Sequence, residues 1–193
     1  MRAGLDSINV RNRNGQPFTV GEVQPYVRFF DDHGTANDRL LAHYLLGLAY
    51  YDHGEAPMAL QCYQDAADCA DTLSADCDYA QLARVYGQMA TVFYYQGLYR
   101  EQLNFERLSV KYAWEGNDTL LALGNNEMEG FSYARLGMTD SAMIIIDSVA
   151  NVFRALGYNK DAAITLGGNI SLLIDMGNYN KAKEYMNIYE AQS

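Results

Sequence analysis

Three histidines, His33, His43 and His53, are the side chains of this sequence best suited to metal binding or proton transfer. A spacing of ten places consecutive histidines on different faces of a helix, and no HExxH or other ligand-spaced cluster accompanies them. The sequence also contains no GxSxG, P-loop or GxGxxG motif. We therefore expect no catalytic residue, no metal and no cofactor. His33 and His53 are expected at helix ends, and His43 between packed helices.

Cysteines, paired glycines and neighbouring acids are the other candidates for chemistry. Cys62 and Cys69 are seven residues apart in one expected helix, about 10 Å along its axis and too far for a disulfide. Together with Cys77 they are interpreted as small packing residues. Gly167-Gly168 in ITLGGNI indicates close helix packing rather than a phosphate-binding loop. Adjacent acids, as in FFDD and NEMEG, are typical of a solvated helix face. An enzyme is not expected.

Composition and charge narrow the fold and the partners. The 193 residues are 49% hydrophobic, enough to bury a sizeable core, and three prolines with few alternating β-branched runs favour helices over sheet. The 24 acidic and 14 basic residues give a net charge of -10, which repels nucleic acid and anionic lipid. No apolar run approaches the roughly 18 to 20 residues of a membrane span. We expect neither a nucleic-acid partner nor membrane insertion.

The elements are set by four glycines that each separate two apolar helical stretches. Their separations are 43, 40 and 40 residues: Gly54, Gly97, Gly137 and Gly177. Each lies where a helix ends and the chain reverses, a position that favours the left-handed backbone of glycine. The near-constant period predicts a row of helical hairpins.

Residues around each glycine repeat as well. A small or medium residue precedes the glycine by seven positions: Gly47, Ala90, Gly130 and Ile170. The fifth residue after it faces this position across the hairpin: Ala59, Gln102, Ala142 and Ala182. The apolar stripe continues at the ninth residue after the glycine, which is Tyr63, Ile146 or Met186 in three of the copies. In the second copy this position is Glu106, and the neighbouring Phe105 is expected to supply the apolar contact instead. A small residue on each of two facing helices lets their axes approach closely, and the large residue four positions before the glycine is expected to fill the wedge beside them: Tyr50, Phe93, Tyr133 and Leu173. This pattern predicts tightly packed helix pairs.

The expected organisation is one solenoid after a partial N-terminal unit. Residues 1–36 contain a polar, turn-prone segment, in which LDSI ends a preceding helix, and a short helix near 22–32. The four expected hairpins then occupy about 37–71, 77–115, 118–156 and 159–190, within one domain that spans 37–193. Asn37, Asp118 and Asn159 are the expected helix caps.

The stretch LLGLAYYDHGEAPMALQCYQDAADCA resembles the tetratricopeptide repeat (TPR) family. The matching residues are Leu46-Gly47, Tyr50, Gly54, Ala59, Tyr63 and Ala66. The other three copies are weaker, and the period exceeds the 34 residues of the family. The resemblance covers about 37–190. It implies an all-α, right-handed superhelix of stacked antiparallel helix pairs, a TPR-like α-α solenoid.

A narrower resemblance concerns the location of the protein. LDSI and RFFDDHGTAND are similar to segments of long-period TPR proteins of the bacterial cell envelope. In that group the repeats commonly form the periplasmic part of an anchored protein. The resemblance thus favours the periplasmic side of a membrane-anchored protein, with a cytoplasmic location as the alternative.

A second stripe on the first helix of each hairpin is expected to line the concave wall. Its tyrosines and arginines are suited to grip a peptide or protein segment. The candidate residues are Tyr44, Leu48, Tyr51, Arg84, Thr91, Tyr94, Tyr95, Glu127, Phe131 and Arg135. The leading hypothesis is therefore a non-catalytic module that binds a protein in this groove. The simpler interpretation is that neighbouring repeats cover these side chains.

Two other hypotheses remain open. A ligand-sensing or regulatory ectodomain would have a closed pocket lined by Tyr51, Tyr94 and Tyr95. Self-association would use the C-terminal end, because Tyr185, Ile188 and Tyr189 need cover and no capping helix follows them. We expect further chain or an association partner to supply that cover.

Overall fold

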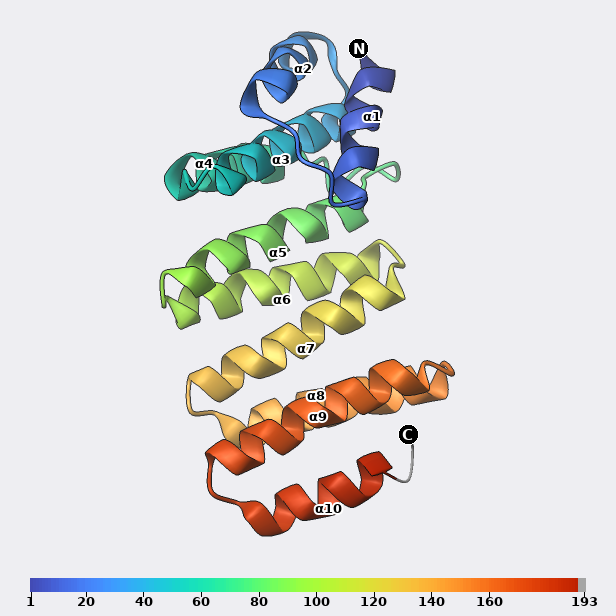
Figure 1. The fold of residues 1–193 in the computed structure, drawn as a ribbon. Helices are drawn as coiled ribbons and strands as arrows, with labels where there is room; N and C mark the ends of the chain where they lie inside the picture. The colour runs from blue at the N-terminus through green and yellow to red at the C-terminus, as the bar shows by residue number, and fades with distance from the viewer. Residues whose placement is uncertain (191–193) are drawn as a thin grey trace.

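The protein is an all-α array of stacked helices, as Figure 1 shows for this computed structural model. The structure describes residues 1–190, and these contain ten helices and no strand. The helices are α1 (Arg2–Arg13), α2 (Val20–His33), α3 (Ala36–Asp52), α4 (Ala56–Cys69), α5 (Tyr79–Tyr95), α6 (Tyr99–Glu115), α7 (Thr119–Arg135), α8 (Thr139–Ala155), α9 (Asn159–Asp175) and α10 (Tyr179–Glu190). Each helix from α2 onward contacts the next one in the chain. The expected all-α solenoid of stacked helix pairs is confirmed.

A rhythm of 20 residues, half the period visible in the sequence, governs the array from α5 onward. The left-handed positions Gly97, Asn117, Gly137, Gly157 and Gly177 follow one another at that interval, with φ values from 54 to 84°. The helices α5 to α9 each have 17 residues, so three residues suffice for every connection. The turns between hairpins therefore have the same backbone conformation as the turns within them. The sequence predicted the glycine turns within hairpins, which are confirmed, and placed loops between hairpins at WEGNDT and LGYNKD without this conformation.

Hydrogen bonds explain why the turn needs a left-handed residue. The amide of the residue after the turn reaches back to the carbonyl five positions earlier, as from Leu98 to Phe93 at 3.0 Å and from Met138 to Tyr133 at 2.9 Å. These bonds satisfy carbonyls that a helix end leaves without intrahelical partners. The reversal is thus built into the backbone, and the side chains remain available for packing.

Two glycines, one in the turn after α7 and one inside α7, should respond oppositely to alanine. Gly137→Ala places a side chain at φ 75° and is expected to destabilise the fold by about 1 kcal/mol. Gly124→Ala, inside α7 with open space around its Cβ position, is expected to stabilise it by about 0.5 to 1 kcal/mol. Urea unfolding of the two variants measures the difference. Equal effects would contradict the role assigned to the turn.

Close approach of paired helices depends on glycine opposite a large side chain. A Cβ on Gly47 would lie 2.4 Å from Cε1 of Tyr63, and one on Gly130 would lie 2.8 Å from Cγ1 of Ile146. Neither glycine can therefore accept a side chain without a shift of its partner helix. The predicted close approach of the paired helices is confirmed in these two hairpins, but the large side chain against each glycine comes from the second helix, which the sequence did not predict.

The second hairpin instead carries a ladder of aromatic rings. Phe93 stacks on Phe105, which stacks on Tyr86, with ring centroids 5.2 and 6.3 Å apart. Tyr112 continues the ladder from Tyr86 at 5.5 Å to Tyr79 at 6.1 Å. Rings from α5 and α6 alternate because each set is spaced by seven residues. Phe105 thus supplies apolar packing next to the position that Glu106 occupies, as the sequence predicted.

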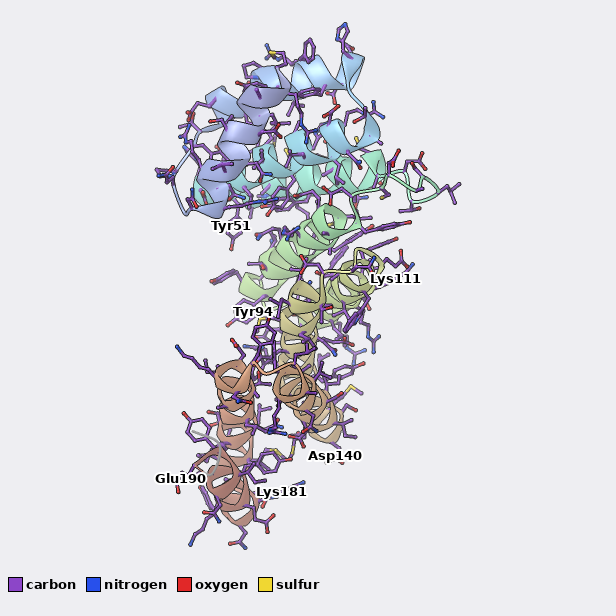
Figure 2. All side chains as sticks on the ribbon, turned by 90° about the vertical axis from the view of Figure 1, so that its right-hand side faces the viewer. Tyr51, Tyr94, Lys111, Asp140, Lys181 and Glu190 are labelled. Carbon is purple, nitrogen blue, oxygen red and sulfur yellow. The ribbon has the colours of Figure 1, made fainter. Side chains whose placement is uncertain are left out.

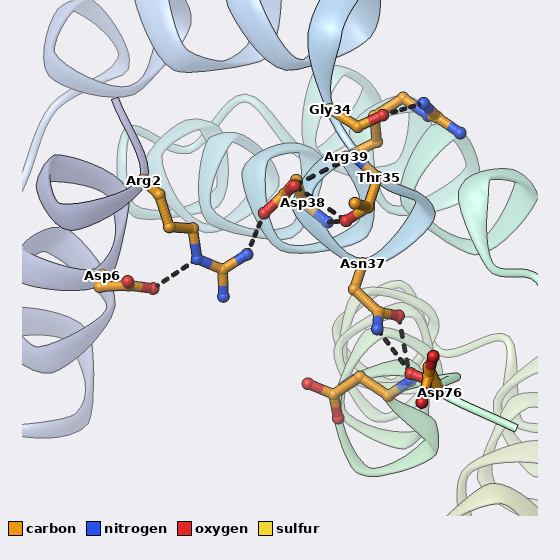
Figure 3. Close-up of polar contacts among 9 residues, drawn as sticks. Arg2, Asp6, Gly34, Thr35, Asn37, Asp38, Arg39 and Asp76 are labelled. Atoms are coloured by element: carbon orange, nitrogen blue, oxygen red, sulfur yellow. Dashed lines mark hydrogen bonds and ion pairs between the residues drawn. The ribbon is translucent and has the colours of Figure 1, made fainter.

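The N-terminal unit differs from its prediction. Residues 2–13 form a complete helix, α1, so LDSI lies inside this helix rather than at an end. Of the expected turn-prone segment RNRNGQPF, residues 14–18 lie in the connection to α2 as predicted, whereas residues 11–13 are helical. Arg2 of α1 pairs with Asp38 of α3, as Figure 3 shows. Leu5 and Ile8 supply the buried face of α1. The polar residues at the end of α1 suggested a turn. The helix forms because its apolar face packs into the N-terminal core.

The observed helix caps differ from the predicted caps at two positions. Thr35, not Asn37, caps α3, in a reciprocal pair with Asp38. Asn37 instead holds the loop before α5, donating from Nδ2 to the carbonyl of Asp76 at 2.6 Å (Figure 3). Asn159 is the first residue of α9 and does not cap it. Asp118 caps α7 as predicted, its Oδ1 accepting from the amide of Leu121 at 3.1 Å.

The hydrophobic core is concentrated in the N-terminal half. One large cluster joins residues of α1 to α5, whereas smaller clusters hold the later helices. Within the described part of the chain, no helix has the length and apolar character needed to cross a lipid bilayer.

Candidate binding groove

A pocket of about 520 Å³ opens where α3, α5, α6 and α7 meet. Helix α5 forms one wall and α7 the other, α6 supplies the floor, and α3 contributes Tyr44 at one end. Figure 2 shows Tyr94 of α5 at the middle of the array. Pockets of about 300 to 1,000 Å³ are typical of ligand sites, so this one has room for several side chains of a bound segment.

Half of the residues proposed from the sequence lie together in this pocket. They are Tyr44, Arg84, Thr91, Tyr94 and Arg135. They come from three first helices of successive hairpins, as the stripe on those helices predicted. Their role in binding stays a prediction.

The other five proposed residues lie elsewhere. Leu48 is buried in the N-terminal core, and Tyr51 packs against that core. Tyr95 is 73% exposed beside the pocket, with its ring against the edge of Tyr94. Glu127 is half-buried, and burial raises its pKa. Phe131 faces a second hollow between α7 and α9, where a Cβ on Gly168 would lie 2.7 Å from its ring.

Both arginines of the pocket already have partners at its rim. The guanidinium of Arg135 lies over the Tyr94 ring, 4.7 Å from its centroid, and joins α7 to α5. Arg84 donates to Oδ2 of Asp118 at 3.1 Å. These contacts fix the two cations on the walls and hold α5 and α7 at either side of the opening.

Polar residues of α6 that the sequence did not assign to the groove form its floor. Gln102 and Glu106 are each 5% exposed and line the pocket, with Gln102 Nε2 donating to Glu106 Oε1 at 2.7 Å. Ser109 donates to the carbonyl of Ala83 at 2.7 Å and accepts from Asn125 at 2.7 Å. The break in the apolar stripe at Glu106 was the signal available in the sequence.

Burial dominates the electrostatics of Glu106. Loss of hydration raises its pKa to about 7, and the carboxylate of Glu129 acts in the same direction. The Gln102 amide, the Ser132 hydroxyl and Arg135 oppose that rise. Ser132 faces the carboxylate, yet within the described residues neither its Oγ nor Oε2 of Glu106 completes a hydrogen bond. The floor therefore contains a carboxyl group whose loss of hydration is only partly offset by hydrogen bonds and nearby charges.

The raised pKa predicts a pH-dependent stability. The folded protein keeps the Glu106 proton at pH values where the unfolded chain, with an ordinary pKa of 4.5, has released it. Stability from this group is therefore full below 4.5 and is lost as pH rises through about 7. Relative to Glu106→Gln, the wild type should lose about 2 to 3 kcal/mol between these limits, measured by urea unfolding. If the difference in unfolding free energy between the two proteins did not change with pH, Glu106 would not be a buried carboxyl group with a raised pKa.

Histidines and cysteines form no metal site within residues 1–190, where no group of three or more potential ligands occurs. His43 contacts Asp31 at 2.8 Å between α3 and α2, while His33 and His53 lie at helix ends. Cys62 is buried, and Cys69 and Cys77 are half-buried thiols without a disulfide.

At the C-terminal end, Tyr185 is partly covered and donates to Asp147.

Comparison with known proteins places this geometry in a structural class. No protein-family model matches the sequence, and no curated protein matches it significantly. TPR-like repeats of a kinesin light chain from Podosopora anserina superpose with a TM-score of 0.75 at 13% identity, covering 99% of this chain and 93% of theirs. The chain has the fold of TPR-like repeat proteins.

Two further solved structures share the fold. Aspartyl phosphate phosphatase F from Bacillus subtilis has a TM-score of 0.71 at 13% identity, over 90% of this chain and 45% of that one. A Rap protein complexed with competence and sporulation factor has a TM-score of 0.56 at 12% identity, over 90% of this chain and 57% of that one. At such identities the likeness establishes the TPR-like fold alone.

Proposed function

We propose that the protein is a non-catalytic interaction module that binds a peptide or protein segment in the groove between α5 and α7. The observation that carries this proposal is the pocket of about 520 Å³, with tyrosine rings and arginine-bearing walls on successive repeats. Aromatic and arginine side chains contribute most binding energy per residue at protein interfaces. The Rap protein of similar fold is complexed with another factor, which supports a binding role for such a scaffold.

No reaction is proposed for the groove. The hydroxyl of Ser109 gives its hydrogen to a backbone carbonyl, so no base activates it as a nucleophile. Glu106 is bonded to an amide, Gln102, rather than to a group that would take part in proton transfer. The phosphatase name of the Bacillus subtilis protein is a statement about that protein.

The sensory alternative receives less support. It required Tyr51, Tyr94 and Tyr95 to line one closed pocket, but Tyr51 and Tyr95 lie outside the lining, and the pocket opens to solvent. An open trough suits an extended segment better than a small molecule, which needs most of its surface enclosed.

Selection from a displayed library of random 12-residue peptides tests the proposed function. Peptides enriched on the wild-type protein should, when added free, protect amides of α5, α6 and α7 from hydrogen exchange. Peptides that protect only α8 to α10, or a selection that enriches none, would contradict the proposal.

A further inference from the structure

We propose that the floor of the groove is a subsite for one cationic side chain, a lysine or arginine of the bound segment, which Glu106 and Gln102 recognise. This inference rests on the proposed function and specifies the chemistry of the partner. Three independent features of the described residues support it: the position of Glu106 in its hairpin, the hydrogen-bonding capacity of the floor, and the arrangement of charge around it.

The first feature is that Glu106 stands where the first and third hairpins bury an apolar side chain. Tyr63 and Ile146 occupy the equivalent positions and are each 0% exposed against a glycine. Gln102 likewise stands where Ala59 and Ala142 are fully buried. Two polar residues in one apolar contact weaken the hairpin, because each must be desolvated. Such a cost is typical of a site that serves binding rather than stability.

The second feature is that two buried acceptors of the floor lack a hydrogen bond among the described residues, although the Ser132 hydroxyl faces one of them. Within residues 1–190, Oε2 of Glu106 and Oε1 of Gln102 are buried and without hydrogen-bond partners. Both residues line the pocket, so a cationic group that reaches its floor lies next to them. A lysine ammonium carries three donors and no acceptor, and an arginine guanidinium carries five. Either group carries enough donors for both oxygens.

The third feature is the arrangement of charge around the site. From α7, Glu129 and Arg135 face Glu106, and Arg135 is held away over the Tyr94 ring. Arg84 of α5 is paired with Asp118. The rim cations are thus already partnered by other groups, while the floor carboxylate has a hydrogen bond from the Gln102 amide and no ion pair among the described residues. The net charge of -10 favours approach of a basic segment.

The walls select a long side chain over a bare cation. Tyr44, Leu121 and Met128 line the pocket above the floor. These apolar surfaces suit the methylene stem of lysine or arginine, whose charged end then reaches the carboxylate. Ionised Glu106 binds such a group best, so the affinity should rise as pH increases from 6 to 8.

A double-mutant cycle on a library-selected peptide tests the subsite. The wild-type protein should enrich peptides with lysine or arginine at one fixed position, and replacing that residue with norleucine should weaken binding at least 10-fold. On Glu106→Gln, which is isosteric, the same replacement should change the affinity less than 2-fold, and the rise between pH 6 and 8 should disappear. Fluorescence anisotropy gives the four dissociation constants, and circular dichroism confirms that the variant is folded.

The outcomes separate this inference from the proposed function. If groove-bound peptides show no basic preference, or norleucine weakens both proteins equally, the cationic subsite is wrong while the groove stands. If no selected peptide protects the amides of α5 to α7 from hydrogen exchange, both proposals fail. A Glu106→Leu variant supplies a second comparison, since it restores an apolar residue and should bind norleucine peptides at least as well as the wild type does.

Discussion

Tyr94→Ala is expected to weaken binding of a groove peptide at least 30-fold while leaving helicity unchanged. The ring lines the pocket, and it holds the guanidinium of Arg135 at 4.7 Å, so its removal takes away contact area and releases a wall residue. Central tyrosines of interfaces contribute about 2 kcal/mol or more, which corresponds to that factor. The side chain is 37% exposed, so the fold should tolerate its loss.

Two other tyrosines provide matched controls for this variant. Tyr179 at the start of α10 is 67% exposed and remote from the groove lining, so Tyr179→Ala should not change the affinity. Tyr95→Ala removes a ring that packs against Tyr94 outside the pocket lining, and a change below about 5-fold is expected. Isothermal titration with one selected peptide measures all three variants. Equal losses at Tyr94 and Tyr179 would reject the groove.

Tyr63→Ala is expected to have the largest effect on stability, about 3 to 5 kcal/mol. The ring is 0% exposed, closes on Gly47 across the first hairpin and lies 6.3 Å from the Tyr44 ring. Because Gly47 has no side chain that could fill the space, removal of the ring leaves a cavity in the largest core cluster. The melting temperature followed by circular dichroism should fall accordingly.

The phenol oxygen of the same residue provides an internal control. Within the described residues the buried hydroxyl of Tyr63 has no hydrogen-bond partner, and burial raises its pKa. Tyr63→Phe keeps the ring and removes an unsatisfied polar group, so it should be neutral or stabilise by about 1 kcal/mol. A large loss in Tyr63→Phe would show that the hydroxyl, rather than the ring, holds the hairpin together.

The turns and the helix pairs could be predicted from the sequence because they depend on local chemistry. Gly54, Gly97, Gly137 and Gly177 occupy a backbone conformation that few other residues adopt, so their period was visible. Asn117 adopts the same conformation at φ 54°, but asparagine also occurs in many other settings. The 20-residue rhythm was therefore missed.

The groove was only partly predictable because exposure depends on which helices cover which faces. Helix α3 is apolar all round, which allows either a buried helix or one with an open stripe. Helix α1 packs against α3 and joins the same core, and Leu48 is buried there. Glu106 was visible as an irregularity, but its position in a pocket requires α5 and α7 together.

Site-specific photo-crosslinking tests the central claim, that the segment lies in the groove between α5 and α7. A benzoylphenylalanine at Gln88, which lines the pocket, should crosslink to a selected peptide. The same group at Ile144 of α8, 70% exposed and outside the lining, should not. Adducts at the first position that unlabelled peptide competes away are the predicted result. Adducts at Ile144 with none at Gln88 would contradict the groove as the binding site.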